Sequence, residues 1–157
     1  MMESHMRIQV SDSYRKDETF RIEEMVTLAD QKLNVQERVP AVQGEAFDLK
    51  TWYRSWKSTH ISEQVDEPTH LRVEAIDEFQ ALMPWSQLDQ ALFLYAQDGQ
   101  PLTKGYPIRL YVPDGSSECL NVKSIVKIWF LHDASLGDEA TYGFKNKVSM
   151  EELKFKK

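Results

Sequence analysis

The chain has 157 residues, of which 41% are hydrophobic and 28% charged, a balance that indicates a single globular domain and excludes wholesale disorder. Its formal net charge of −6, without any long basic run, argues against a nucleic-acid partner, because phosphate binding needs clustered cations. A single cysteine, Cys119, excludes an intrachain disulfide, and the chain has neither an apolar run of membrane length nor a secretory signal, so we expect a cytoplasmic protein that does not contact a membrane.

The N-terminal third of the chain begins with polar sequence and continues with apolar alternation. Charged and polar residues dominate positions 11–19, which we expect to be a loop within a flexible N-terminal segment, residues 1–19. Apolar residues then recur at every second position in several fragments between 20 and 35. Because successive side chains of a strand point to opposite faces, this spacing predicts half-buried strands.

An amphipathic helix is predicted at residues 49–56. Leu49, Trp52, Tyr53 and Trp56 have the spacing of one helical face, and Asp48 is a suitable N-cap. The two tryptophans allow two interpretations, a stacking surface for a ring or part of the core. Their helical spacing favours the core.

The rest of the chain is mostly of strand type. A polar loop over 58–69 precedes a strand at 71–75, and Ser86 is placed to cap a short helix that runs through residue 91. Further strands are predicted at 92–96, 108–112 and 122–131, with turns at 98–99 and 113–115, and a flexible tail over 145–157. The order of elements predicts one mixed, β-rich α+β domain over residues 1–157.

Two neighbouring segments carry the most informative pattern, DQALFLYAQDGQPL at 89–102 and KGYPIRLYVPDGSSECLNVKSIVKIWF at 104–130. In the second, a Gly-Tyr-Pro turn leads into a strand that carries Arg109 among apolar neighbours. A loop rich in Gly and Ser then leads to a strand that opens with Lys123. Such a layout can aim cations and backbone N–H groups at an anionic group, such as a cofactor phosphate.

These segments resemble the molybdopterin-binding domain of the sulfite-oxidase superfamily. The first resembles its alanine- and tyrosine-rich strand with an "NGEPL" turn, and the second its "HGxPxRLVVP" and "xKxIxxI" strands. Upstream, VEAIDEFQALMPW at 73–85 resembles the family's "DGY…LP" segment, and QGEAFDLKTWYRSW at 43–56 its short "GVPLxxLL" helix. The motifs follow one another in the family's order, so the resemblance implies the mixed, β-rich α+β fold of this family.

The resemblance also implies a cofactor-binding site. Arg109 matches the family's strand arginine and Lys123 its strand lysine, and both belong to the region that grips the pterin. Lys104 stands where the family has a histidine. The lysine keeps a positive charge but lacks the hydrogen-bond acceptor of the imidazole ring. The loop between Arg109 and Lys123 is one residue longer than the usual family loop.

Molybdenum in catalytic members is held by a cysteine thiolate, a soft ligand supplied from the segment before the short helix. The corresponding stretch here, EMVTLADQKLNVQERVPAV at 24–42, contains no cysteine. We therefore expect no catalytic residue, no metal ligand and no bound cofactor, although molybdopterin is the cofactor that the resemblance implies. Cys119 lies at a different place in the motif order. Its thiol could be a substitute metal ligand or a redox thiol, but we favour an ordinary loop residue.

Other polar residues lack the spacing of a site. No pair of histidines has the i, i+4 spacing of a helical metal site, which favours surface or capping roles over ligation. The histidines are His5, His60, His70 and His132. The neighbouring carboxylates of Asp77 and Glu78 would point to opposite faces of a strand, so a turn or a solvated edge is favoured over paired acid–base chemistry.

Three hypotheses follow from these observations. The leading one is a molybdopterin-binding-like domain without molybdenum redox catalysis, which binds a small anionic ligand through Lys104, Arg109 and Lys123. The second is an active molybdopterin-dependent oxidoreductase with an atypical metal ligand set. The third is a protein-interaction module whose old site is filled by side chains, which clustered exposed aromatic residues such as Trp52 or Trp85 would favour. The sequence does not identify a protein partner.

Overall fold

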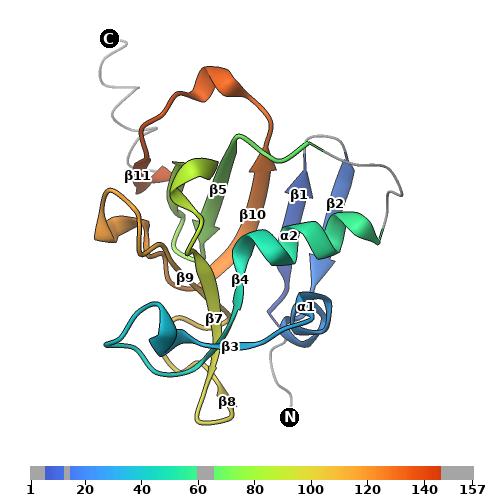
Figure 1. Ribbon diagram of the computed structural model, residues 1–157, viewed down its shortest axis with the longest axis vertical. Coiled ribbons are helices and arrows are strands. Elements are labelled where there is room, and N and C mark those ends of the chain that lie inside the picture. Colours follow the sequence, from blue (N-terminus) through green and yellow to red (C-terminus); the bar gives the residue numbers. More distant parts are fainter. Residues whose placement is uncertain (1–5, 13–14, 60–65, 146–157) are drawn as a thin grey trace.

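The computed structural model describes residues 6–12, 15–59 and 66–145, and Figure 1 shows how its elements are arranged. In this part of the chain the fold is mixed α+β, with two α-helices and two β-sheets. The coarse fold class predicted from the sequence is therefore confirmed. None of the helices described is long and apolar enough to cross a membrane.

The first sheet has six strands and contains both ends of the described chain. In spatial order its strands are β11 (Thr141–Phe144), β6 (Phe79–Pro84), β5 (His70–Ala75), β10 (Ile125–Leu131), β1 (Ile8–Asp12) and β2 (Arg15–Phe20). Strands β1 and β10 are parallel, with Val10 opposite Ile128, whereas the other neighbours are antiparallel. The parallel pair joins the N-terminal hairpin to the C-terminal half of the chain.

The second sheet has five strands and is built around β7. Its strands are β3 (Leu33–Asn34), β4 (Glu45–Asp48), β7 (Leu92–Gln97), β8 (Gln100–Pro101) and β9 (Arg109–Tyr111). Along one edge of β7, β9 pairs with its first half and β8 with its last residues. On the other edge β7 pairs with β4. The strand that carries Arg109 therefore lies beside this central strand.

Helix α2 (Leu49–Ser58) fills the main core with aromatic side chains. The ring of Trp52 lies 5.5 Å from Phe20 on the first sheet and 6.5 Å from Phe47 on the second. Trp52 and Trp56 are both fully buried, and Asp48 caps the helix by accepting a hydrogen bond of 2.8 Å from the backbone N–H of Thr51. The predicted helix and its N-cap are confirmed, and the two tryptophans belong to the core.

Most expectations for the N-terminal third are wrong. Of the residues expected to form a loop, 11–12 end β1 and 15–19 belong to β2, so the segment expected to be flexible contributes two strands to the first sheet. The strands expected between 20 and 35 are replaced largely by helix α1 (Ile22–Ala29). Its start is capped by Glu24, whose carboxylate accepts a 2.8 Å hydrogen bond from the backbone N–H of Arg21.

Further differences occur after residue 75. The short helix expected from Ser86 is a single 3₁₀ turn, Trp85–Gln87. Strands β6 and β11 were not predicted, although β6 includes part of the segment that was compared with the family's "DGY…LP" motif. Apart from Lys145, the tail expected over 145–157 lies outside the described residues.

Candidate functional site

The segments around Lys104, Arg109 and Lys123 run side by side. The backbone N–H of Ser124 donates to the carbonyl of Gly105 at 3.2 Å, and that of Leu110 donates to Val122 at 2.9 Å. Because Gly105 follows Lys104 and Ser124 follows Lys123, these two hydrogen bonds bring the three predicted cations to neighbouring positions.

The side chain of Arg109 lies along this junction. Its guanidinium carbon is 5.2 Å from the centre of the Tyr111 ring, within the range of a cation–π contact. Its aliphatic part covers Gly105, where any added Cβ would overlap the Cγ and Cδ atoms of Arg109. Gly105 also has a φ of +88°, a conformation that favours glycine. The glycine thus gives Arg109 the space to lie across the turn.

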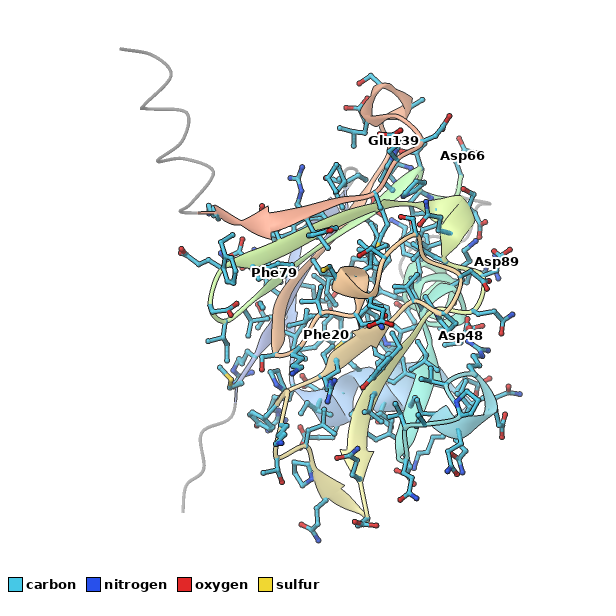
Figure 2. All side chains as sticks on the ribbon, turned by 90° about the vertical axis from the view of Figure 1, so that its left-hand side faces the viewer. Phe20, Asp48, Asp66, Phe79, Asp89 and Glu139 are labelled. Atoms are coloured by element: carbon cyan, nitrogen blue, oxygen red, sulfur yellow. The ribbon has the colours of Figure 1, made fainter. Side chains whose placement is uncertain are left out.

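The three cations have no acidic partner among the described residues. Lys104 and Lys123 are exposed and Arg109 is half-buried, and none of them forms an ion pair or a side-chain hydrogen bond within residues 6–12, 15–59 and 66–145. Basic residues elsewhere do form such pairs, at N–O distances of 2.6 to 2.7 Å. These pairs are Arg38 with Asp48, Lys50 with Asp89, and Arg54 with Glu67. Figure 2 shows Asp48 and Asp89 on one side of the molecule and Phe79 on the other.

Cys119 lies in the loop that joins the two cationic segments. It is exposed on a 3₁₀ turn, Glu118–Leu120, and its backbone N–H donates to the hydroxyl of Ser117 at 3.0 Å. Across the described part of the chain, no three His, Cys, Asp or Glu side chains converge to hold a metal ion.

Two of the four histidines lie in the described chain. His70 is buried, with its Nδ1 2.8 Å from the Thr69 hydroxyl and its Nε2 2.6 Å from the carbonyl of Gly137. The Nε2 of His132 lies 3.4 Å from the carboxylate of Asp12. His5 and His60 lie outside the described residues.

Asp77 and Glu78 form the turn between β5 and β6. Asp77 accepts a hydrogen bond of 3.1 Å from the backbone N–H of Phe79, and Glu78 has a φ of +71°. The Asp77 side chain therefore serves the backbone of the turn, as the sequence favoured.

A large cavity lies beside the cationic residues but is not lined by them. It has a volume of about 750 Å³ and lies between α1, β4 and the β7–β8 hairpin, with Tyr106 at its margin. Within it the hydroxyl of Tyr95 donates a hydrogen bond of 3.1 Å to the carboxylate of Glu45. Burial, together with the negative charge of Glu45, raises the pKa of Tyr95 to about 12.

Sequence reasoning did not find this cavity. Its walls come from segments that are far apart in the chain, and α1, which forms one wall, was expected to be β-structure. The only local signal is the half-buried pair Ile22 and Val26, which has the i, i+4 spacing of one helical face and lines the cavity.

A buried polar cluster was also missed. The carboxylate of Asp12 accepts a hydrogen bond of 2.7 Å from the hydroxyl of Tyr53 and lies 3.4 Å from the Nζ of Lys57. These residues come from β1 and α2, so their proximity depends on the tertiary fold and leaves no motif in the sequence.

Comparison with models of known protein families gives no match to this chain, and a search of curated proteins likewise finds no relative.

Proposed function

We propose that this protein is a cytoplasmic domain with the molybdopterin-binding fold of the sulfite-oxidase superfamily, which binds a small anionic ligand without molybdenum redox chemistry. One observation carries the proposal. Lys104, Arg109 and Lys123 lie on hydrogen-bonded neighbouring segments and have no carboxylate partner among the described residues. Cationic residues on adjacent segments without a counter-charge favour the approach of an anion.

The chemistry of the three side chains favours a phosphate-like group. A guanidinium group offers a planar pair of N–H donors to two oxygens of one anion, and the lysines add point charges on flexible stems. The half-buried position of Arg109 against Gly105 and Tyr111 restricts its side chain, which reduces the entropy lost on binding. The exposed lysines make the site open and sensitive to salt.

The residues present suit the anionic end of a pterin cofactor better than its metal. Residues 24–42, which form α1, β3 and the connection to β4, include no thiol, and Cys119 is exposed in a different loop. A soft thiolate is the ligand that the family's molybdenum centre uses. Residues 24–42 therefore supply no ligand of this kind to a molybdenum centre.

The anion site is tested by titrating the protein with inorganic pyrophosphate at low salt and measuring binding by isothermal titration calorimetry. We expect Arg109→Ala to weaken binding about tenfold or more, because a charge-assisted hydrogen bond contributes about 1.5–3 kcal/mol. Lys32→Ala is the matched control, since this exposed lysine lies outside the cationic cluster. Equal affinities of Arg109→Ala and the unmodified protein would overturn the proposed site.

A second experiment tests the absence of redox chemistry. The protein is produced in a host that synthesises molybdopterin, and its molybdenum content is measured. We expect less than stoichiometric metal and no oxidase or reductase activity. Stoichiometric molybdenum that is retained by the unmodified protein and lost in Arg109→Ala would favour the alternative, an active molybdopterin-dependent oxidoreductase with an atypical ligand set.

A protein-interaction module is the second candidate. Trp52 and Trp85, the aromatic residues named for it, are buried, but three other large apolar residues are exposed near one end of β6 and β11. They are Ile76, Tyr142 and Phe144. If this surface joins two copies of the chain, Tyr142→Ser with Phe144→Ser should convert a dimer into a monomer in sedimentation velocity, whereas a monomeric unmodified protein contradicts such self-association.

A further inference from the structure

The cavity beside α1 has the dimensions of a small-molecule site. Its volume of about 750 Å³ falls within the range of known ligand pockets, roughly 300–1,000 Å³. Three elements form its walls: the first two turns of α1, the start of β4 and the β7–β8 hairpin. Figure 1 shows α1 and β8 on neighbouring parts of the molecule, below the first sheet.

The walls are apolar over much of their surface. Ile22 and Val26 of α1 face the cavity from one side, and Ala96 and Pro101 of the hairpin from another. Ile22 and Val26 are only half-buried, so a ligand in the cavity would cover apolar surface that is otherwise in contact with water. This favours a ligand with an apolar body.

Among the described residues, the charged side chains that line the cavity leave an excess of negative charge. Arg21, the one basic residue in this described lining, lies 3.7 Å from the carboxylate of Glu24. The carboxylates of Glu23 and Glu45 also line the cavity, and neither forms an ion pair with a described residue. Glu23 is in the first turn of α1, where an acidic residue also stabilises the helix. Glu45 has no such role and is the stronger indication of a positively charged ligand.

Tyr95 holds the Glu45 carboxylate without neutralising it. The tyrosine is 7% exposed, and its hydroxyl donates to Oε1 of Glu45 at 3.1 Å. This hydrogen bond engages one oxygen of the carboxylate, and the second oxygen has no hydrogen-bond partner among the described residues. The rings of Tyr95 and Tyr106 add aromatic surface to the lining. Aromatic rings beside carboxylates are the surroundings in which organic ammonium groups bind.

We propose that this cavity binds a small organic cation, a quaternary ammonium or protonated amine attached to an apolar body, with the positive group at Glu45. The site is distinct from the anion site at Arg109, since none of Lys104, Arg109 and Lys123 lines the cavity. It therefore does not depend on the function proposed above.

The test is a titration of the full chain with phenyltrimethylammonium, in which binding is measured from the chemical shifts of backbone amides in two-dimensional NMR spectra. We expect saturable changes centred on Val26, Glu45 and Ala96, and no changes at these three residues with benzenesulfonate, which has a similar body and the opposite charge. Glu45→Gln keeps the shape and the acceptor for Tyr95 but removes the charge. It should weaken binding about fivefold, the scale of one solvent-exposed charge contact.

Two further variants separate the cavity from the surface. Val26→Trp should fill the cavity from α1 and abolish binding while the spectrum remains that of a folded protein. Glu118→Gln, an exposed glutamate outside the cavity, should leave the affinity unchanged and Arg109→Ala should do the same. The proposal is overturned by no saturable binding of the cation, by equal shifts of the cavity residues with benzenesulfonate, or by unchanged affinity in both Glu45→Gln and Val26→Trp.

Discussion

The hydroxyl of Tyr53 donates a hydrogen bond of 2.7 Å to the fully buried carboxylate of Asp12. One turn further along the same helix, the Nζ of Lys57 lies 3.4 Å from the other oxygen of this carboxylate. His132, which follows β10, approaches it at 3.4 Å. Asp12 ends β1, so a single buried carboxylate connects α2 to β1 and to the residue that follows β10.

Replacing Asp12 with alanine should strongly destabilise the protein. The amine of Lys57, only 4% exposed, would lose its counter-ion in a position where water does not reach it. Breaking a buried ion pair from one side costs about 3–5 kcal/mol, so we expect a loss of this size in the free energy of unfolding, measured by urea denaturation. Asp138→Ala, at an exposed position, should have little effect. Equal midpoints for the two variants would mean that the cluster does not stabilise the fold.

Trp52 connects the two helices through its indole ring. Its Nε1–H donates to the carbonyl of Met25 in α1 at 3.0 Å, and the side chain is fully buried. We expect Trp52→Ala to lower the free energy of unfolding by about 3–5 kcal/mol, because it leaves a large cavity and removes a buried hydrogen bond. Trp129→Ala, which removes a half-buried tryptophan from β10, should cost clearly less in the same denaturation experiment. The opposite order would contradict the central position of Trp52.

How far the sequence predicts the fold depends on how distinct each local pattern is. The face of α2 was predicted because four apolar residues repeat with helical spacing behind a capping aspartate. Helix α1 was mistaken for β-structure because Ile22, Val26 and Leu28 also fit an alternation of two. Glu24, which acts as a cap three residues after Arg21, favours the helix. In β2 the polar composition hid an edge strand, which needs few apolar residues.

The two candidate sites also differ in how far the sequence predicts them. The sequence identified Lys104, Arg109 and Lys123 because they lie within one stretch of twenty residues whose turns and strands can be predicted from local patterns. The cavity at Tyr95 and Glu45 was not, because the two residues are fifty positions apart and meet only through the pairing of β4 with β7. A long-range contact of this kind leaves no spacing that a single sequence can reveal.

The alkaline titration of Tyr95 gives a test of its surroundings. The pKa of this phenol is raised to about 12, mainly by burial and also by the charge of Glu45, whereas an ordinary tyrosine titrates near 10. Since the folded protein holds the proton more tightly, this group contributes stability that is present below pH 10 and is lost as the pH rises towards 12. Ultraviolet absorbance should therefore show a late phenolate transition that disappears in Tyr95→Phe. In Glu45→Gln this transition should move to lower pH, and an unchanged transition would contradict the contact with Glu45.

The packing of Arg109 on Gly105 can be tested by substitution, with Gly99 as the control. Gly105 and Gly99 have φ values of +88° and +74°, so an alanine at either position is strained by its backbone conformation. Only at Gly105 does the added Cβ also meet a side chain, since nothing lies within 4 Å at Gly99. We expect Gly99→Ala to cost about 1 kcal/mol of unfolding free energy and Gly105→Ala clearly more.

The excess cost at Gly105 should depend on Arg109. In the double variant Gly105→Ala with Arg109→Ala the overlapping Cγ and Cδ atoms are absent, so the penalty of Gly105→Ala should fall towards that of Gly99→Ala. Gly105→Ala alone should also weaken pyrophosphate binding, because Arg109 must leave the turn to make room for the methyl group. If the double-mutant cycle shows additive penalties, Arg109 does not occupy the space over Gly105 in solution, and the cationic cluster loses the contact that orients its guanidinium group.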